Sequence, residues 1–230
     1  MEFHWLGIPM LLNLFIMSKP RTLLFVIPVI ILSFAWFNSS GYWKKAKTPP
    51  VGNSTNEYKT SNVATEKLLA KAAEAKIFAE QNSYNESICF LVDMSLASGR
   101  DRFFVYSLKK DSSQTAGLVT HGSCNTSWLE GRKFGNSVGC GCTSLGKYRI
   151  GNAYNGRFGL AFKLYGLDKT NSNAFNRFVV LHSHDCVPET EVKDDICQSL
   201  GCPTVSPGFL LKLKALIHES KKPVLLWIYN

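Results

Sequence analysis

A cysteine and two histidines have the types and the spacing that thiol chemistry needs. Cys202 ends the segment "SLGC", and His182 and His184 end the apolar run "VVLHSH", twenty and eighteen residues earlier. A thiol is a useful nucleophile at neutral pH when a base takes its proton, and histidine is the usual base. A glycine before the cysteine lets backbone N–H groups approach a reacting carbonyl, as an oxyanion hole requires. Both histidines stay candidates, because residues two apart in a strand share a face.

The other six cysteines allow a metal site or disulfides. No pair has the two-residue spacer of common zinc sites, and "CGC" at 140–142 is a poor chelating segment, so zinc is the less favoured interpretation. Disulfides are compatible with a catalytic Cys202, because six cysteines could form up to three bridges. Cys186 with Cys197, and Cys124 with either Cys140 or Cys142, are the pairs that we expect.

The composition indicates a globular domain with a basic surface. The chain has 230 residues, 45% of them hydrophobic, and a formal charge of +9. This charge favours an anionic partner, although a soluble basic surface explains it equally well. The sequence shows no fixed repeat, no basic helix stripe and no basic-aromatic strand pattern, so we expect no nucleic-acid partner.

The N-terminal quarter has the pattern of a targeting segment. Residues 1–21 form a leader, and translation could start at Met17. Residues 22–43 are uncharged and long enough to cross a bilayer as a helix, which predicts a signal anchor or a signal sequence. The poor cleavage site favours an uncleaved anchor over a released protein, and a hairpin of both apolar runs is the alternative. Residues 44–62 read as a flexible linker.

The rest of the chain predicts a mainly β domain with a few helices, over residues 63–230. A helix is expected at 64–82 and another after the N-cap Ser206, with Pro207 as its first residue. Short runs rich in β-branched and aromatic residues predict strands at 88–95, 102–108, 117–122, 147–152, 158–167, 178–183 and 223–229. The long Gly- and Cys-rich stretch 121–146 is expected to be a functional loop.

These segments resemble a known family when they are taken in order. "VVLHSHDCV", "SLGCPTVSP", a terminal helix and "PVLLWIY" are similar to the murein L,D-transpeptidases, and "TSLGKYRIG" is similar to the turn and strand ahead of their site. The resemblance covers residues 88–229. It implies a β-sandwich or mixed-sheet catalytic domain behind the N-terminal anchor, with no cofactor and no metal.

The resemblance also implies a reaction and roles for named residues. Cys202 would form a thioester with the tetrapeptide stem of peptidoglycan, release D-alanine and pass the acyl group to an amine; transfer to water would make the enzyme a carboxypeptidase. His182 would be the base, in preference to His184, and the N–H groups of Gly201 and Cys202 would hold the oxyanion. Ser183 or Ser199 would orient the imidazole or the substrate. Weaker candidates for substrate binding are His184, Thr143, Ser144, Gly146, Tyr148 and Arg149.

Some residues depart from the family pattern and leave other functions open. Leu200 replaces a common histidine, Pro203 a common arginine, Ser144 a common proline and Ser183 the commoner glycine. These changes concern donor and acceptor preference more than the thiol chemistry. The alternatives are an exported wall-binding domain without activity, and an exported binding protein stabilised by zinc or disulfides. The expected partners are peptidoglycan stem peptides and, through the anchor, the bacterial membrane, with the domain in the periplasm.

Overall fold

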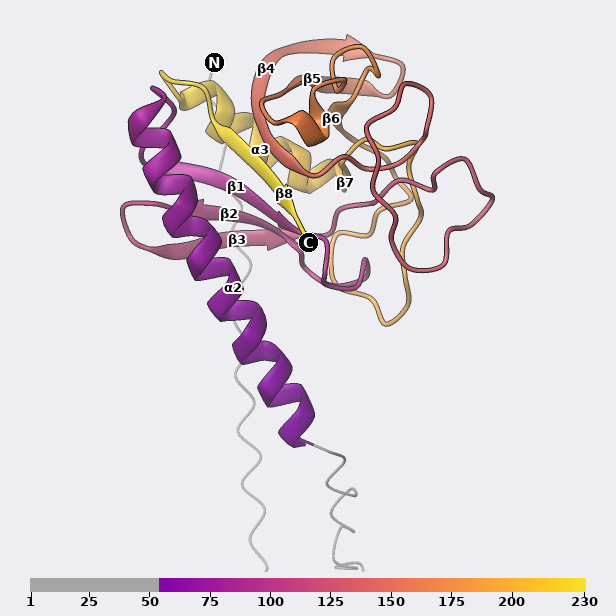
Figure 1. The fold of residues 1–230 in the computed structure, drawn as a ribbon, viewed down its shortest axis with the longest axis horizontal. Helices are drawn as coiled ribbons and strands as arrows, with labels where there is room; N and C mark the ends of the chain where they lie inside the picture. Colours follow the sequence, from indigo (N-terminus) through magenta and orange to yellow (C-terminus); the bar gives the residue numbers. More distant parts are fainter. Residues whose placement is uncertain (1–53) are drawn as a thin grey trace, which may run out of the picture. The chain divides into compact units, whose positions relative to one another are not determined.

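Eight strands form one mixed sheet in residues 54–230, the part of the chain that the computed structural model describes (Figure 1). Its order is β3-β2-β1-β8-β4-β5-β6-β7, with β1·β8 and β6·β7 parallel and the other neighbours antiparallel. The strands are β1 (Ile88–Asp93), β2 (Phe103–Ser107), β3 (Ser112–Gly117), β4 (Gly146–Gly156), β5 (Gly159–Gly166), β6 (Val180–Ser183), β7 (Thr204–Val205) and β8 (Leu225–Tyr229). The predicted mainly β fold with a few helices is therefore confirmed.

Two helices pack on opposite faces of the sheet. Strand β1 shows this by alternation: Phe90 packs in the core that α3 (Pro207–Glu219) covers, whereas Leu91 packs in the core under α2 (Ser54–Gln81). Phe209, Leu210 and Leu213 are the buried residues of α3. Ser206 caps this helix as predicted, because its hydroxyl accepts a hydrogen bond from the N–H of Phe209 at 3.3 Å.

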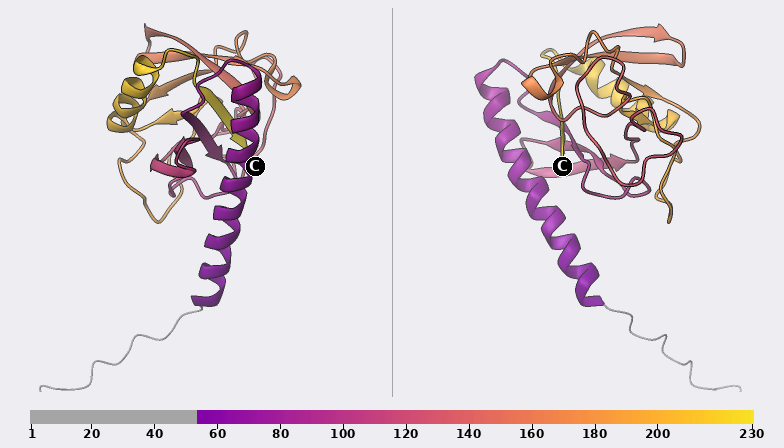
Figure 2. Two further views of the ribbon diagram at one scale, coloured as in Figure 1. Left: turned by 90° about the vertical axis from the view of Figure 1, so that its left-hand side faces the viewer. Right: turned by 45° about the vertical axis from the view of Figure 1, so that its right-hand side comes forward.

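Helix α2 is longer than the sequence suggested. We expected it at 64–82, but it begins at Ser54, so the last nine residues of the expected linker are helical. Propagation of a helix that is already held by packing adds one hydrogen bond per residue, so a polar segment rich in Asn, Ser and Thr can join it. The two views in Figure 2 show the start of α2 extending past the sheet. The expected leader, membrane span and remaining linker lie outside the described residues.

The strand predictions succeed where the strand has an apolar face and fail where it does not. β3 was missed, because it is a polar edge strand, "SSQTAG", that relies on its pairing with β2. Of the segment predicted as a strand at 117–122, Gly117 ends β3, and the rest forms only isolated bridges, Val119 to Val205 and Gly122 to Ser199. β4 runs four residues beyond its predicted end and has a register shift between Ile150 and Ala153.

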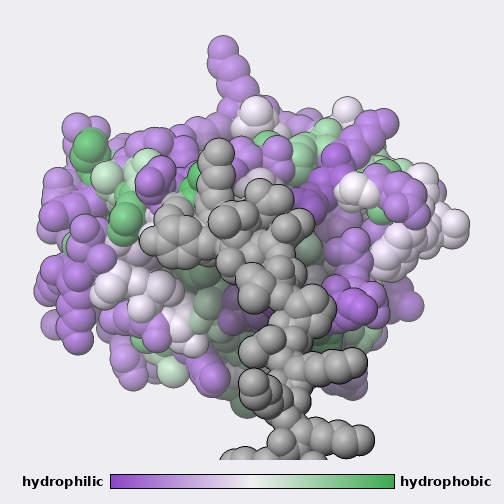
Figure 3. Space-filling view, turned by 90° about the horizontal axis from the view of Figure 1, so that it is seen from below, coloured by the Kyte–Doolittle hydropathy of each residue, from purple (hydrophilic) through white to green (hydrophobic). Residues whose placement is uncertain are grey.

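On the face seen in Figure 3, the visible part of the described residues is mostly hydrophilic, with hydrophobic residues scattered among the others. Within residues 54–230, we find no helix with both the length and the apolar character that a bilayer span requires. The longer of the two α-helices, α2, buries Ala72, Ala75 and Ala79 against the sheet.

Candidate active site

Strands β6 and β7 bring Cys202 and His182 to one pocket. The parallel pairing sets His182 beside Thr204, and Cys202 comes two residues before Thr204. The N–H of Val180 points at the Cys202 Sγ atom across a distance of 3.5 Å. A pocket of about 180 Å³ is lined by both residues, together with Tyr154, Gly156, Arg157, Phe158, Ala161, Phe178 and Val180. Two residues that lie twenty positions apart in the chain thus share one cavity.

The imidazole of His182 is held in one tautomer by the backbone. Its Nδ1 atom lies 3.0 Å from the carbonyl oxygen of Ser183, which can only accept, so Nδ1 carries the proton. The Nε2 atom is then the basic nitrogen, and it lies 3.1 Å from the Thr204 hydroxyl. This hydroxyl also lies 3.4 Å from the carbonyl oxygen of Cys202, so a rotation can release Nε2 to accept another proton.

Burial keeps both members of the pair uncharged near neutral pH. Desolvation raises the pKa of the Cys202 thiol, although the Val180 N–H and the charge of Arg177 act in the opposite direction. Desolvation also lowers the pKa of His182; the Ser183 carbonyl counters this, and the nearby His184 adds to it. A neutral thiol beside a neutral imidazole calls for removal of the thiol proton by a general base during attack.

Hydrogen bonds hold the backbone around Cys202 in place. The Ser199 hydroxyl donates to the carbonyl oxygen of Cys202 at 2.7 Å and accepts from the N–H of Gly201 at 3.1 Å. Thr120 donates to the same carbonyl at 3.2 Å. The Gly201 N–H is therefore engaged, whereas the N–H of Cys202 has no acceptor among residues 54–230. Of the two N–H groups that we expected to hold an oxyanion, the one on Cys202 is available.

Gly201 is required by its backbone conformation and by its neighbours. Its φ is +107°, and a Cβ there would lie 2.6 Å from the carbonyl oxygen of Cys142. The Arg177 guanidinium donates to that carbonyl and to the hydroxyl of Ser144, and it also reaches the Gly135 carbonyl at 2.9 Å. Arg177 thus fixes the part of the long loop whose Cys142 carbonyl lies against Gly201.

A row of side chains on one face of the sheet forms the pocket. The register aligns Tyr154 of β4 with Ala161 of β5, and Ala161 with His182 of β6. Residues directly opposite each other in neighbouring strands point to the same face. Ala161 is small, so it leaves an open floor between the Tyr154 ring and the His182 ring. Phe158, in the β4–β5 turn, stacks on His182 with ring centroids 5.1 Å apart.

A comparison with protein-family models identifies the family of the domain that contains this pocket. A model of the L,D-transpeptidase catalytic domain matches residues 59–229. The chain belongs to the L,D-transpeptidase catalytic-domain family. A comparison with curated proteins found no match.

A comparison with solved structures gives a partial similarity to another protein. The helical cell shape determining protein Pgp2 (K307A mutant) from Campylobacter jejuni aligns with a TM-score of 0.43 and 13% sequence identity. The alignment covers 63% of this chain and 47% of that one. This chain therefore spans about half the length of that protein.

The turn and strand that resemble the L,D-transpeptidase block lie behind the pocket. Thr143 accepts a hydrogen bond from the Gly122 N–H, and the buried Tyr148 donates to the Ser144 carbonyl at 2.7 Å. Gly146 has φ +127° and packs against Asp168 and Asn171, while Arg149 lies 4.2 Å from the Tyr165 ring centroid. The residues that line the Cys202 pocket do not include these five, Thr143, Ser144, Gly146, Tyr148 and Arg149.

The second histidine lies at the edge of the site. His184 is exposed, accepts a hydrogen bond from the Cys186 N–H at Nδ1, and meets the edge of the Phe158 ring at 5.6 Å. It does not line the pocket that contains Cys202, whereas His182 does. The geometry therefore favours His182 as the base.

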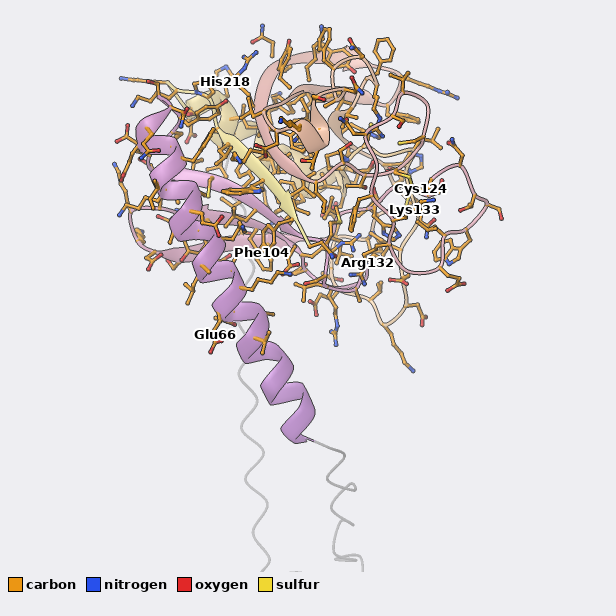
Figure 4. All side chains as sticks on the ribbon, viewed as in Figure 1. Glu66, Phe104, Cys124, Arg132, Lys133 and His218 are labelled. Atoms are coloured by element: carbon orange, nitrogen blue, oxygen red, sulfur yellow. A yellow bond between two sulfur atoms is a disulfide. The ribbon has the colours of Figure 1, made fainter. Side chains whose placement is uncertain are left out.

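Disulfides account for four of the cysteines. Cys186 pairs with Cys197 as expected, and Cys124 pairs with Cys142 rather than Cys140. Cys89, Cys140 and Cys202 are free. Figure 4 shows Cys124 next to Lys133 in the long loop, and the sulfur lies 3.6 Å from the Lys133 carbonyl oxygen. In residues 54–230, no three His, Cys, Asp or Glu side chains gather in a way that could hold a metal ion.

Sequence reasoning missed several residues of the site. Phe158 and Tyr154 line the pocket, and Val180 and Thr204 contact its two reactive residues. Arg177 acts on Cys202 through its charge. Thr204 and Val180 could have been found, since each lies two residues from a candidate in the sequence. Phe158 and Arg177 carry no pattern that marks them, because one lies in a two-residue turn and the other in a loop.

Proposed function

We propose that this domain is an acyltransferase that uses Cys202 as its nucleophile on peptidoglycan stem peptides. The observation that carries the proposal is the pocket that Cys202 and His182 share, together with the Ser183 carbonyl, which fixes the His182 tautomer and leaves Nε2 as the basic nitrogen. Family membership supports a peptidoglycan substrate. The basic character of the chain, with a formal charge of +9, suits an anionic wall polymer.

The proposed first half-reaction forms a thioester. His182 Nε2 takes the proton of the Cys202 thiol, and the sulfur attacks the carbonyl carbon at the L-centre of the diamino acid, third in the stem. The N–H of Cys202 donates to the oxyanion that forms. Collapse of the tetrahedral intermediate breaks the C–N bond, and Nε2–H protonates the departing amine of D-alanine. The Val180 N–H, 3.5 Å from the sulfur, stabilises the thiolate character that develops.

The second half-reaction releases the acyl group. A neutral amine attacks the thioester carbonyl and loses its proton to Nε2, and the thiolate leaves and recovers that proton. Water in place of the amine would give a carboxypeptidase by the same steps. The competing proposal, a wall-binding domain without activity, requires that Cys202 never acylates.

Intact mass spectrometry tests the proposal directly. The protein is incubated with a tetrapeptide-stem muropeptide, alongside Cys202→Ala and the control Cys140→Ser, which removes another free thiol. We expect a covalent adduct with loss of D-alanine in the unsubstituted protein and in Cys140→Ser, and none in Cys202→Ala. A folded, unsubstituted protein that forms no adduct and releases no D-alanine would sink the proposal and favour the binding domain.

We further propose that the domain works outside the cytoplasm. Two disulfides support this, because such bonds persist in oxidising compartments. The apolar segment 22–43 suits an anchor or export signal on the sequence evidence already given. Fractionation of cells that produce the full chain, followed by protease accessibility from the outer side, tests this location.

A further inference from the structure

A second pocket adjoins the one that holds Cys202. Its volume is about 90 Å³, and its lining includes Tyr154, Phe178 and Val180, which also line the first pocket. Lys163, Phe175, Leu164 and Val179 complete it. The two cavities are therefore neighbours with a common wall, and the smaller one has room for a few water-sized groups.

The strand register places Lys163 directly beside the reactive centre. Lys163 of β5 pairs with Val180 of β6, and the N–H of Val180 reaches the Cys202 sulfur. Ala161 pairs with His182, so Lys163 points to the same face as His182, one step along the strands. That step is two residues, or roughly 6.6 Å. An extended peptide substituent next to the reacting carbonyl spans a similar distance.

Lys163 is an exposed residue whose ammonium lies near two aromatic rings and near no carboxylate of the described residues. Its Nζ atom lies 5.8 Å from the ring centroid of Tyr154 and 6.0 Å from that of Phe175. It forms none of the ion pairs found among residues 54–230. Lysine is the only charged residue in this lining. A small cavity with aromatic walls and one uncompensated positive charge is suited to an anionic group.

Phe178, which lines both pockets, has an unusual backbone conformation. Its φ is +56°, in the left-handed region, and its side chain is 84% exposed. A bulky residue adopts this conformation only at a cost in backbone strain, and residues of this kind cluster at functional sites. Because the exposed Phe178 ring is not packed in the hydrophobic core, we expect its role to be in lining the two pockets.

We propose that Lys163 binds a carboxylate of the acyl donor and makes the enzyme prefer stems that carry it. The proposal rests on the proposed acyl transfer at Cys202. The positive charge of Lys163 disfavours binding of the amine acceptor in this pocket. The acceptor amine exists mostly as an ammonium, which Lys163 would repel. The donor has two suitable carboxylates besides that of the leaving D-alanine: one on the acidic residue before the diamino acid, and one at the far end of the diamino acid itself.

Kinetics with matched donors test the proposal. Three tetrapeptide donors are compared. One has both carboxylates, one is amidated at the acidic residue, and one has lysine, which lacks the far carboxylate, in place of the diamino acid that carries it. Each is assayed by D-alanine release with the unsubstituted enzyme, Lys163→Gln, Lys163→Arg and Lys214→Gln. Lys214 is an exposed lysine of α3, so its change removes the same charge elsewhere.

The expected result is a loss of discrimination in one variant alone. The unsubstituted enzyme should favour the complete donor over one of the modified donors by roughly threefold to tenfold in kcat/KM, mainly through KM. Lys163→Gln should bring that ratio close to one, while Lys163→Arg and Lys214→Gln keep it. Which modified donor is disfavoured identifies the carboxylate.

The failures of the two proposals are distinguishable. An active Lys163→Gln enzyme that keeps the full donor preference would overturn the carboxylate assignment and leave the acyl transfer standing. An unsubstituted enzyme without a preference would do the same. If no donor acylates Cys202 at all, both proposals fall.

Discussion

The protonation state of the Cys202–His182 pair determines how the Cys202 thiolate forms. Burial pushes the thiol pKa up and the imidazole pKa down, so the charged pair is disfavoured in the resting protein. A general-base mechanism then needs neutral His182, and its ionisation should govern the acid side of the rate profile. The same reasoning gives the thiol little reactivity without substrate.

Acylation is therefore expected to persist below the ordinary pKa of histidine. The acid limb of kcat/KM should have its midpoint below 6.5, because the pKa of His182 is lowered from that value. His184→Asn removes a nearby positive charge and should move the midpoint upward, whereas His218→Asn, on α3, should not. The measurement is D-alanine release from pH 4 to 9. A midpoint at or above 6.5, or one that His184→Asn leaves in place, would contradict this view of the pair.

At the scale of elements, the long loop supports the segment that carries the nucleophile. The Cys124–Cys142 disulfide closes a loop with a sequence separation of 18 residues. The Cys142 carbonyl packs against Gly201 and receives the Arg177 guanidinium. The conformation of the bridge and that of the reactive segment are thus connected by one backbone carbonyl.

Removing this bridge should weaken both the fold and the activity. A Cys124→Ser, Cys142→Ser double variant is expected to lose about 3 kcal/mol of unfolding free energy by loop entropy, and to release D-alanine more slowly. Cys140→Ser, which changes a free thiol in the same loop, should stay within about 1 kcal/mol of the unsubstituted protein. Urea unfolding and the release assay are the measurements. Equal behaviour of the two variants would show that the bridge does not support the site.

The elements also show what the sequence could and could not predict. Strands with an apolar face, such as β1 and β8, were found, and the N-cap Ser206 located α3. β3 and β7 were not, because one is polar throughout and the other has two residues that pair only after distant segments meet. Residue types alone proposed Cys202 with either His182 or His184, and the family resemblance gave the preference for His182. Phe158 reaches the site from the β4–β5 turn and Lys163 through strand register, and no local pattern encodes either placement.

At the scale of the whole molecule, a buried basic cluster makes stability depend on pH. Arg102 is fully buried and donates to the carbonyl oxygens of Leu96 and Val119. Its guanidinium also lies 3.2 Å from His121 Nδ1. Burial, then Arg102 and Arg132, lower the pKa of His121 to about 4, against a smaller opposing effect of Asp195. His121 is therefore neutral in the folded protein at neutral pH.

Acid should destabilise the fold through His121. The unfolded chain binds a proton at this histidine below about 6.5, and the folded protein does so only near 4. The contribution of neutral His121 to the free energy of unfolding is fully present above pH 6.5 and decreases as the pH falls. The decrease ends below about pH 4, and its total is about 3 kcal/mol. His121→Asn should flatten this part of the stability curve, and His218→Asn, at the exposed end of α3 (Figure 4), should not. Urea unfolding at several pH values decides; equal slopes for both variants would refute it.

The extension of α2 past the sheet has a consequence for helical phase. Lys67 on this helix bonds Asp93 of β1, and Ser54–Glu66 continue the helix beyond that bond for about 20 Å; Glu66 is exposed there (Figure 4). A coil would absorb an inserted residue, but a helix converts it into rotation. One extra residue before Lys67 would turn Ser54 by about 100° around the axis and advance it about 1.5 Å, and seven would nearly restore its direction. The direction in which the chain enters the domain is therefore periodic in the length of this segment.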